Sequence, residues 1–189
     1  IKGGDFMCEY ALIAEFDEKT NDYFFKLWES LRQEGMLPEK SHAKSPHITI
    51  ADYLEIDSDK FIRSMNAFYK DKKKIVLNLK SLGTFLNTET LYFAPNLSRE
   101  LLDFHLEHHN SFSDFKNYEN SYYLPGNWIP HCTVGSRLGR KNIIKIFEYC
   151  YNNPINFKSE ISKLSLLRFE ISNEGKILDI KEVHREYLK

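Results

Sequence analysis

A tetrapeptide that begins with proline and histidine occurs twice in the sequence. The first copy is Pro46–Thr49 (Pro-His-Ile-Thr) and the second is Pro130–Thr133 (Pro-His-Cys-Thr). Each copy is followed by a β-branched residue, which is typical of a strand. Residues two positions apart in a strand project from the same face, so each copy presents an imidazole beside a hydroxyl. Imidazole has an unperturbed pKa of about 6.5 and can serve as acid or base at neutral pH. The repeat predicts a symmetric catalytic site made from two similar strands.

The candidate catalytic residues are therefore His47, Thr49, His131 and Thr133. The preceding prolines hold the residue before them in an extended conformation and donate no hydrogen bond, so each strand is expected to begin at its histidine.

If the alternation continues, the histidine-bearing faces run on through matching positions. Ala51 and Gly135 are the small residues on these faces, and we expect them to leave room for a bound group. Tyr53 and Arg137 come next, and both are candidates for contact with substrate. Ordinary packing or surface charge explains these two side chains equally well.

Three further positions are candidates for substrate binding. Lys44 lies three residues before the first histidine and would add positive charge. Phe85, and Tyr122 or Tyr123 in a long irregular stretch, offer aromatic faces on which a nucleobase can stack. For each of them, surface charge or core packing is an equally good interpretation.

Composition and charge are those of a globular protein. The 189 residues are 42% hydrophobic and 28% charged, with a net charge of −1. This balance argues against a broad grip on duplex DNA, which requires many cationic contacts, but it suits a small anionic ligand or a single RNA end. The three cysteines do not form a disulfide framework, and no apolar run is long enough to cross a membrane. We expect a monomeric cytoplasmic protein, and we interpret residues 1–6 as an expression remnant.

Hydrophobic periodicity predicts alternating strands and helices. The expected strands are 9–16, 47–54, 75–79, 81–85, 91–94, 131–134, 158–172 and 176–186, and the expected helices are 20–34, 58–70, 99–112 and 140–152. Residues 113–129 form the longest irregular stretch and are interpreted as a lid or specificity loop. The order strand, helix, motif strand, helix, strand occurs twice, which predicts one domain over residues 7–189 with halves at about 7–80 and 81–189.

Three histidines at helical spacing suggest a metal site as an alternative. His105, His108 and His109 lie at positions i, i+3 and i+4, but no cysteine or strong carboxylate partner lies nearby in the sequence. Cys132 follows His131 directly and therefore points to the other face of the strand, where it is expected to pack in the core. We expect neither a metal nor a cofactor.

The doubled motif, together with Leu82–Phe85 and Leu91–Phe93, resembles the 2H phosphoesterase superfamily, in its branch of 2′-5′ RNA ligases and RNA 2′,3′-cyclic phosphodiesterases. The similarity extends over the chain from Met7 onward. It implies an α+β fold with two pseudo-symmetric lobes, each an antiparallel sheet backed by helices, and an active cleft between them. Arg137 departs from the family pattern, because relatives often carry an arginine closer to the second motif.

The resemblance also implies metal-independent cleavage of a 2′,3′-cyclic phosphate or a 2′–5′ linkage in a nucleotide or an RNA terminus, with possible reverse ligation. One histidine would act as base and the other as acid, while Thr49 and Thr133 would donate to phosphate oxygens. Two other functions stay open: a nucleotide- or RNA-end-binding module without turnover, and a metal-dependent hydrolase that uses the histidine-rich helix.

Overall fold

The computed structural model describes residues 7–38, 44–172, 174 and 177–189. The elements in chain order are β1 (Met7–Phe16), α1 (Glu18–Gln33), β2 (His47–Tyr53), α2 (Ser58–Tyr69), β3 (Ile75–Leu77), β4 (Leu79–Phe85), β5 (Thr90–Pro95), α3 (Arg99–Ser111), β6 (Cys132–Gly135), α4 (Gly139–Asn152), β7 (Ser159–Ile171) and β8 (Ile177–Tyr187). Residues 1–6 and His42 lie outside the described residues.

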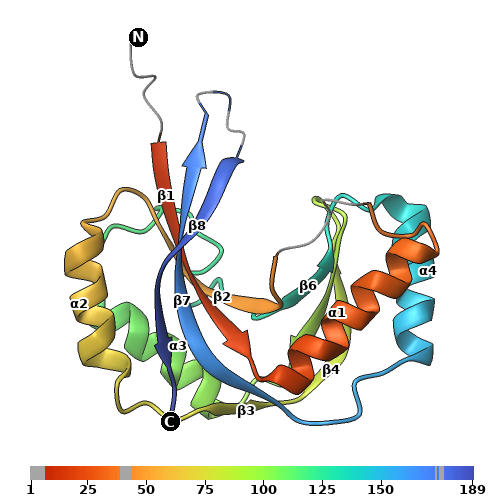
Figure 1. The fold of residues 1–189 in the computed structure, drawn as a ribbon, viewed down its shortest axis with the longest axis horizontal. Helices are drawn as coiled ribbons and strands as arrows, with labels where there is room; N and C mark the ends of the chain where they lie inside the picture. The colour runs from red at the N-terminus through yellow and green to blue at the C-terminus, as the bar shows by residue number, and fades with distance from the viewer. Residues whose placement is uncertain (1–6, 39–43, 173, 175–176) are drawn as a thin grey trace.

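Two antiparallel sheets form the framework. The larger sheet has the order β2-β1-β7-β3, with β8 also paired to β7, and the smaller sheet has the order β4-β5-β6. Helices α2 and α3 lie against the larger sheet, while α1 and α4 lie against the smaller one (Figure 1). The predicted α+β class, with two sheets each backed by helices, is confirmed.

Each sheet takes strands or helices from both halves of the chain. The C-terminal hairpin β7–β8 joins the sheet of the first motif, since β7 pairs with β1 from Met7↔Ile171 to Phe16↔Ile161. Helix α1, in turn, packs on the sheet of the second motif, where the Trp28 indole donates to the carbonyl of Val134 at 2.9 Å. The division expected near residue 80 therefore does not coincide with the two sheets.

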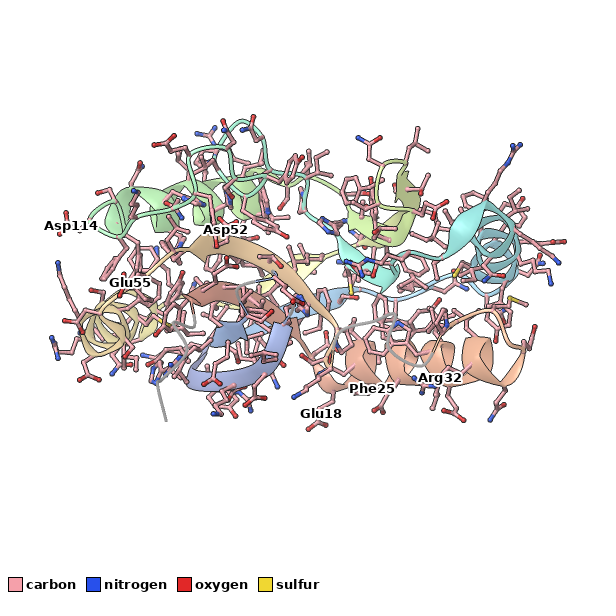
Figure 2. The ribbon with its side chains drawn as sticks, turned by 90° about the horizontal axis from the view of Figure 1, so that it is seen from above. Glu18, Phe25, Arg32, Asp52, Glu55 and Asp114 are labelled. Carbon is pink, nitrogen blue, oxygen red and sulfur yellow. The ribbon has the colours of Figure 1, made fainter. Side chains whose placement is uncertain are left out.

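Local sequence explains where the helices begin. Asp17, Asp57 and Ser98 cap α1, α2 and α3 by accepting a hydrogen bond from the backbone N–H three residues later. The inward stripe of α1 contains Phe24, Leu27, Trp28 and Leu31. Its opposite face carries Glu18, Phe25 and Arg32, which point away from the sheet (Figure 2). No helix over the described residues is long and apolar enough to span a membrane.

Candidate active site

The two motif strands are end strands of their sheets and contact each other. β2 is the terminal strand of the larger sheet and β6 that of the smaller one. They lie side by side where the two sheets meet (Figure 1). β2 begins at His47, as expected from the proline before it, whereas β6 begins at Cys132, one residue after its histidine. The fold thus places the two copies of the motif next to each other.

Both histidines are held by the same hydrogen bond. The Nδ1 of His47 lies 2.8 Å from the carbonyl of Ser45, and the Nδ1 of His131 lies 2.7 Å from the carbonyl of Ile129. A carbonyl oxygen can only accept, so Nδ1 carries the hydrogen in both rings. Each Nε2 then has a free lone pair and is the atom that can take or give a proton.

The electrostatic environment lowers the pKa of both rings. Burial is the main cause for His47, and the charge of His131 lowers its pKa further. Burial likewise lowers the pKa of His131. The two imidazoles are therefore close enough for the protonation of one to disfavour protonation of the other, as a coupled acid–base pair requires.

A buried carboxylate on β1 acts against this lowering. Glu15 is the cross-strand neighbour of His47, and its negative charge raises the pKa of that imidazole. The Glu15 carboxylate accepts a hydrogen bond from Ser165 at 2.6 Å and lies 3.5 Å from the ammonium of Lys163. Sequence analysis missed this contact, because Ser165 and Lys163 come from the distant strand β7.

A β-bulge follows the threonine in each motif. In β2, Thr49 pairs with Ile13 and Ala51 with Leu12, which leaves Ile50 as the extra residue. In β6, Thr133 pairs with Tyr92 and Gly135 with Leu91, so Val134 is the extra residue. Both strands accordingly have two consecutive buried positions at this point. A bulge redirects the side chains that follow it.

The bulges change the fate of the small residues that were expected to leave room for a ligand. Ala51 is fully buried. A Cβ on Gly135 would lie 2.6 Å from Leu37 and 2.9 Å from Leu138. The small side chains at these positions serve core packing instead.

The bulges also redirect two predicted substrate contacts. Tyr53 lies in the core at 0% exposure, with its hydroxyl 2.6 Å from the Nε2 of His108. Arg137 lies in an exposed turn after β6 with a φ of 54°, and its amide donates to Thr88. Neither residue continues the face of its histidine as the simple alternation predicted.

Asp52 takes the place on β2 that Tyr53 was expected to hold. It lies beside the segment that joins α3 to β6 (Figure 2), where its carboxylate accepts from the Ser121 hydroxyl at 2.6 Å. With Glu9 and Tyr118, Asp52 lines a shallow, open pocket. Burial raises the pKa of the Asp52 carboxyl.

Aromatic rings surround His131. The Phe85 ring packs edge-on against this imidazole with centroids 4.8 Å apart, and the Tyr92 ring lies 5.1 Å away. Tyr92 lies across Gly83 on the neighbouring strand, where a Cβ would come within 2.6 Å of the tyrosine ring. Phe85 therefore lies where it was predicted, whereas the contact of Tyr92 was missed. The Gly83–Tyr92 strand pair is the signal that would have revealed it.

The remaining predicted contacts fall in different places. Tyr123 is half-buried and hydrogen-bonds the Thr49 side chain, whereas Tyr122 is 83% exposed. Lys44 is exposed; its charge is a minor influence on Asp179, whose pKa is lowered chiefly by a backbone hydrogen bond. Tyr123 is thus the aromatic residue of the loop that touches a motif residue.

The histidine-rich helix uses its rings for hydrogen bonding within the protein. His105 bonds the carbonyl of Tyr123 at 2.8 Å, and its ring stacks on Trp128 at 3.8 Å. His108 lies between the hydroxyls of Tyr53 and Tyr69, and its pKa is lowered by burial. Within the described residues, no group of three or more His, Cys, Asp or Glu side chains is arranged to hold a metal ion.

Cys132 lies on the core side of β6. Its thiol is 1% exposed, and burial raises its pKa. A buried thiol that resists deprotonation is a poor nucleophile. The pairing of Cys132 with His131 as a nucleophile is therefore excluded on geometry, as the strand alternation predicted.

Comparison with known proteins decides the family. The model of the 2′-5′ RNA ligase superfamily matches residues 21–172. The chain belongs to this superfamily. Members of the 2′-5′ RNA ligase superfamily are 2H phosphoesterases, so the predicted family is confirmed, and a phosphodiesterase or ligase type of activity is indicated.

Solved structures of the superfamily share the fold. Apo LigT from E. coli matches with a TM-score of 0.62 and 12% identity, covering 98% of this chain and 99% of LigT. A protein described as a phosphoesterase matches with a TM-score of 0.63 and 11% identity, over 96% of this chain and 98% of its own. The protein TT0787 of Thermus thermophilus gives 0.62 and 12%, over 95% and 97%. No curated protein matches the sequence.

Proposed function

We propose that the protein is a metal-independent phosphodiesterase that opens 2′,3′-cyclic phosphates, or cleaves 2′–5′ linkages, in nucleotides or RNA ends. The observation that carries the proposal is the matched pair of Nδ1–carbonyl hydrogen bonds on adjoining strands. They leave two Nε2 atoms of the same tautomer to act on one phosphate.

The reaction needs two proton transfers and one displacement at phosphorus. One neutral imidazole takes a proton from water as its oxygen forms a bond to phosphorus. The other, protonated imidazole gives its proton to the ribose oxygen as that P–O bond breaks. The product is a phosphomonoester, and the two histidines have exchanged their protonation states. The same steps in reverse would join two RNA ends.

Thr49 and Thr133 supply the hydrogen bonds that stabilise the transition state in this proposal. Each lies two residues after its histidine, with one residue between them buried on the other face. Charge gathers on the non-bridging oxygens during the displacement, and hydroxyls fixed beforehand need no reorganisation at that moment.

The ligand is proposed to be a nucleotide. LigT has been solved with 3′-AMP, with NADP+ and with ATP, which are ligands of that protein. In the present chain, Phe85 and Tyr92 beside His131 offer an aromatic surface for a base or a ribose. Tyr123 limits the site on the Thr49 side.

The proposed function is tested by incubation with 2′,3′-cyclic nucleotides and with 2′–5′-linked dinucleotides in excess EDTA. We expect hydrolysis that is insensitive to the chelator, with a 2′-phosphate as product of the cyclic substrate. Nucleotide binding without turnover would contradict the proposal in favour of a binding module, and loss of activity in EDTA would contradict it in favour of a metal-dependent enzyme.

The pH profile should have its maximum on the acidic side. The productive form carries one proton on the histidine pair, and its population peaks between the two apparent pKa values. Both are lowered from 6.5 in the free protein, so kcat/KM should be bell-shaped with a maximum below pH 6.5. Steady-state kinetics across the acidic and neutral range measure this directly. A maximum above about pH 7 would contradict it.

Gly83→Ala should lower activity through Tyr92. The new Cβ would lie 2.6 Å from the Tyr92 ring, which must move away from His131. Displacements of about 1 Å at an active site cost up to about 10²-fold, so we expect kcat/KM to fall by about tenfold or more. Ser81→Ala, at an exposed position on the same strand, is the matched control. Equal activity of the two variants would show that Tyr92 does not support the site.

A further inference from the structure

The two bulges leave a buried backbone carbonyl directly after each motif threonine. Ile50 and Val134 are the extra residues of their strands, and both are fully buried. A bulge interrupts the ladder of hydrogen bonds, and a carbonyl that is buried without a partner is costly. Each of these carbonyls therefore needs a donor from outside its sheet.

Both donors are ring N–H groups from a helix. The Val134 carbonyl accepts from the Nε1 of Trp28 on α1 at 2.9 Å. The Ile50 carbonyl lies 3.3 Å from the Nε2 of His109 on α3. The two residues differ in type and in position along the chain, yet they occupy the same place relative to the two motifs. This is a second level of symmetry that the tetrapeptides alone do not reveal.

The first motif has an additional contact of this kind. The Nε1 of Trp128 donates to the Thr49 carbonyl at 2.9 Å, and the Trp128 ring stacks on His105. The peptide groups on both sides of Ile50 are thus held by donors outside the sheet. The conformation of the backbone at Thr49 depends on these contacts, because the bulge interrupts the regular ladder there.

The form of the His109 ring follows from its partner. A carbonyl only accepts, so the Nε2 of His109 must carry a hydrogen. Burial lowers the pKa of this half-buried imidazole, which favours the neutral ring at neutral pH. The neighbouring rings of His105 and His108 lie 4.6 Å and 5.3 Å from it between centroids.

We propose that Trp28 and His109 are positioning residues, whose ring N–H groups fix the two bulges and so aim the hydroxyls of Thr133 and Thr49. The proposal rests on the proposed function for its kinetic consequence. Neither residue lies within a motif. Each acts on the peptide group that follows a threonine, and a rotation of that group would turn the hydroxyl away from the phosphate.

His109 allows the sharper test because it is half-buried, whereas Trp28 is 1% exposed and its truncation would leave a cavity. His109→Gln keeps an N–H donor, while His109→Met fills similar space without one. Asn110→Ala, at the adjacent exposed position of α3, controls for changes in the helix.

We expect His109→Met to lower kcat on a 2′,3′-cyclic nucleotide by about tenfold with KM within about twofold, because the lost contact acts in the transition state. His109→Gln should recover most of kcat, and the two variants should have similar melting temperatures. Full kcat in His109→Met, or an equal loss in both variants, would overturn the proposal.

A measurement without turnover separates this proposal from the proposed function. In ¹⁵N NMR of the histidine side chains, His109 should show the tautomer with hydrogen on Nε2, and His109→Met should shift the Thr49 methyl resonance while leaving that of Thr133 in place. Observation of the other tautomer, or no shift at Thr49, would overturn the positioning role. An inactive wild-type protein that still shows these signals would contradict only the proposed function.

Discussion

Replacement of His131 with alanine is expected to remove nearly all hydrolysis of a 2′,3′-cyclic nucleotide, and His47→Ala should do the same. Loss of a proton-transfer group costs about 10²–10⁴ in rate. Both imidazoles have their Nδ1 committed to a backbone carbonyl, so no other nitrogen of either ring can take over the role of Nε2. Measurement of kcat for each variant and for the double variant provides the test.

The double variant and a third histidine make this result specific. Residues that act as one unit are strongly non-additive, so the double variant should be little slower than either single variant. His184→Ala is the control, because His184 is a half-buried histidine on β8 that bonds Glu186 at 3.1 Å, away from the motif strands. Near-normal turnover in His47→Ala or in His131→Ala would contradict the acid–base assignment.

Thr49→Val and Thr133→Val are expected to lower kcat by about 10²-fold or more, the cost of one oxyanion donor. Valine keeps the branched shape that suits these strands and removes only the hydroxyl. Because the hydroxyls are proposed to act in the transition state, kcat and kcat/KM should fall together. Steady-state kinetics of both variants measure the two parameters separately.

Thr84→Val is the matched control for these substitutions. Thr84 lies on β4, and its buried hydroxyl has no hydrogen-bond partner among the described residues. Its loss should leave the rate unchanged. A rise in KM with an unchanged kcat for Thr49→Val or Thr133→Val would mean that the hydroxyls bind substrate and transition state equally, against the role proposed for them.

Much of the fold follows from local sequence. The capping residues Asp57 and Ser98, and the apolar stripes that follow them, led to helices that the structure confirms within one or two residues. The motif strands were equally clear, since proline and β-branched residues mark their beginning and their course. These signals lie within a few residues of the elements that they define.

The features that sequence alone did not predict depend on distant partners. The bulge at Ile50 exists because β2 pairs with β1 in a particular register, and that at Val134 depends on β5. A strict alternation therefore placed Tyr53 beside His47, whereas the bulge turns it into the core. The contact of Glu15 with Ser165 and the ring contacts of Tyr92 likewise join segments that are far apart in the chain.

The central claim is that the two imidazoles act on one phosphate through their Nε2 atoms. Titration of the ¹⁵N-histidine-labelled protein with a nucleoside 2′-monophosphate, followed by NMR of the ring nitrogens, tests it most directly. We predict that the Nε2 signals of His47 and His131 shift together with one dissociation constant and one ligand per chain, while both Nδ1 atoms stay protonated. A shift of only one ring, or two separate dissociation constants, would contradict the account.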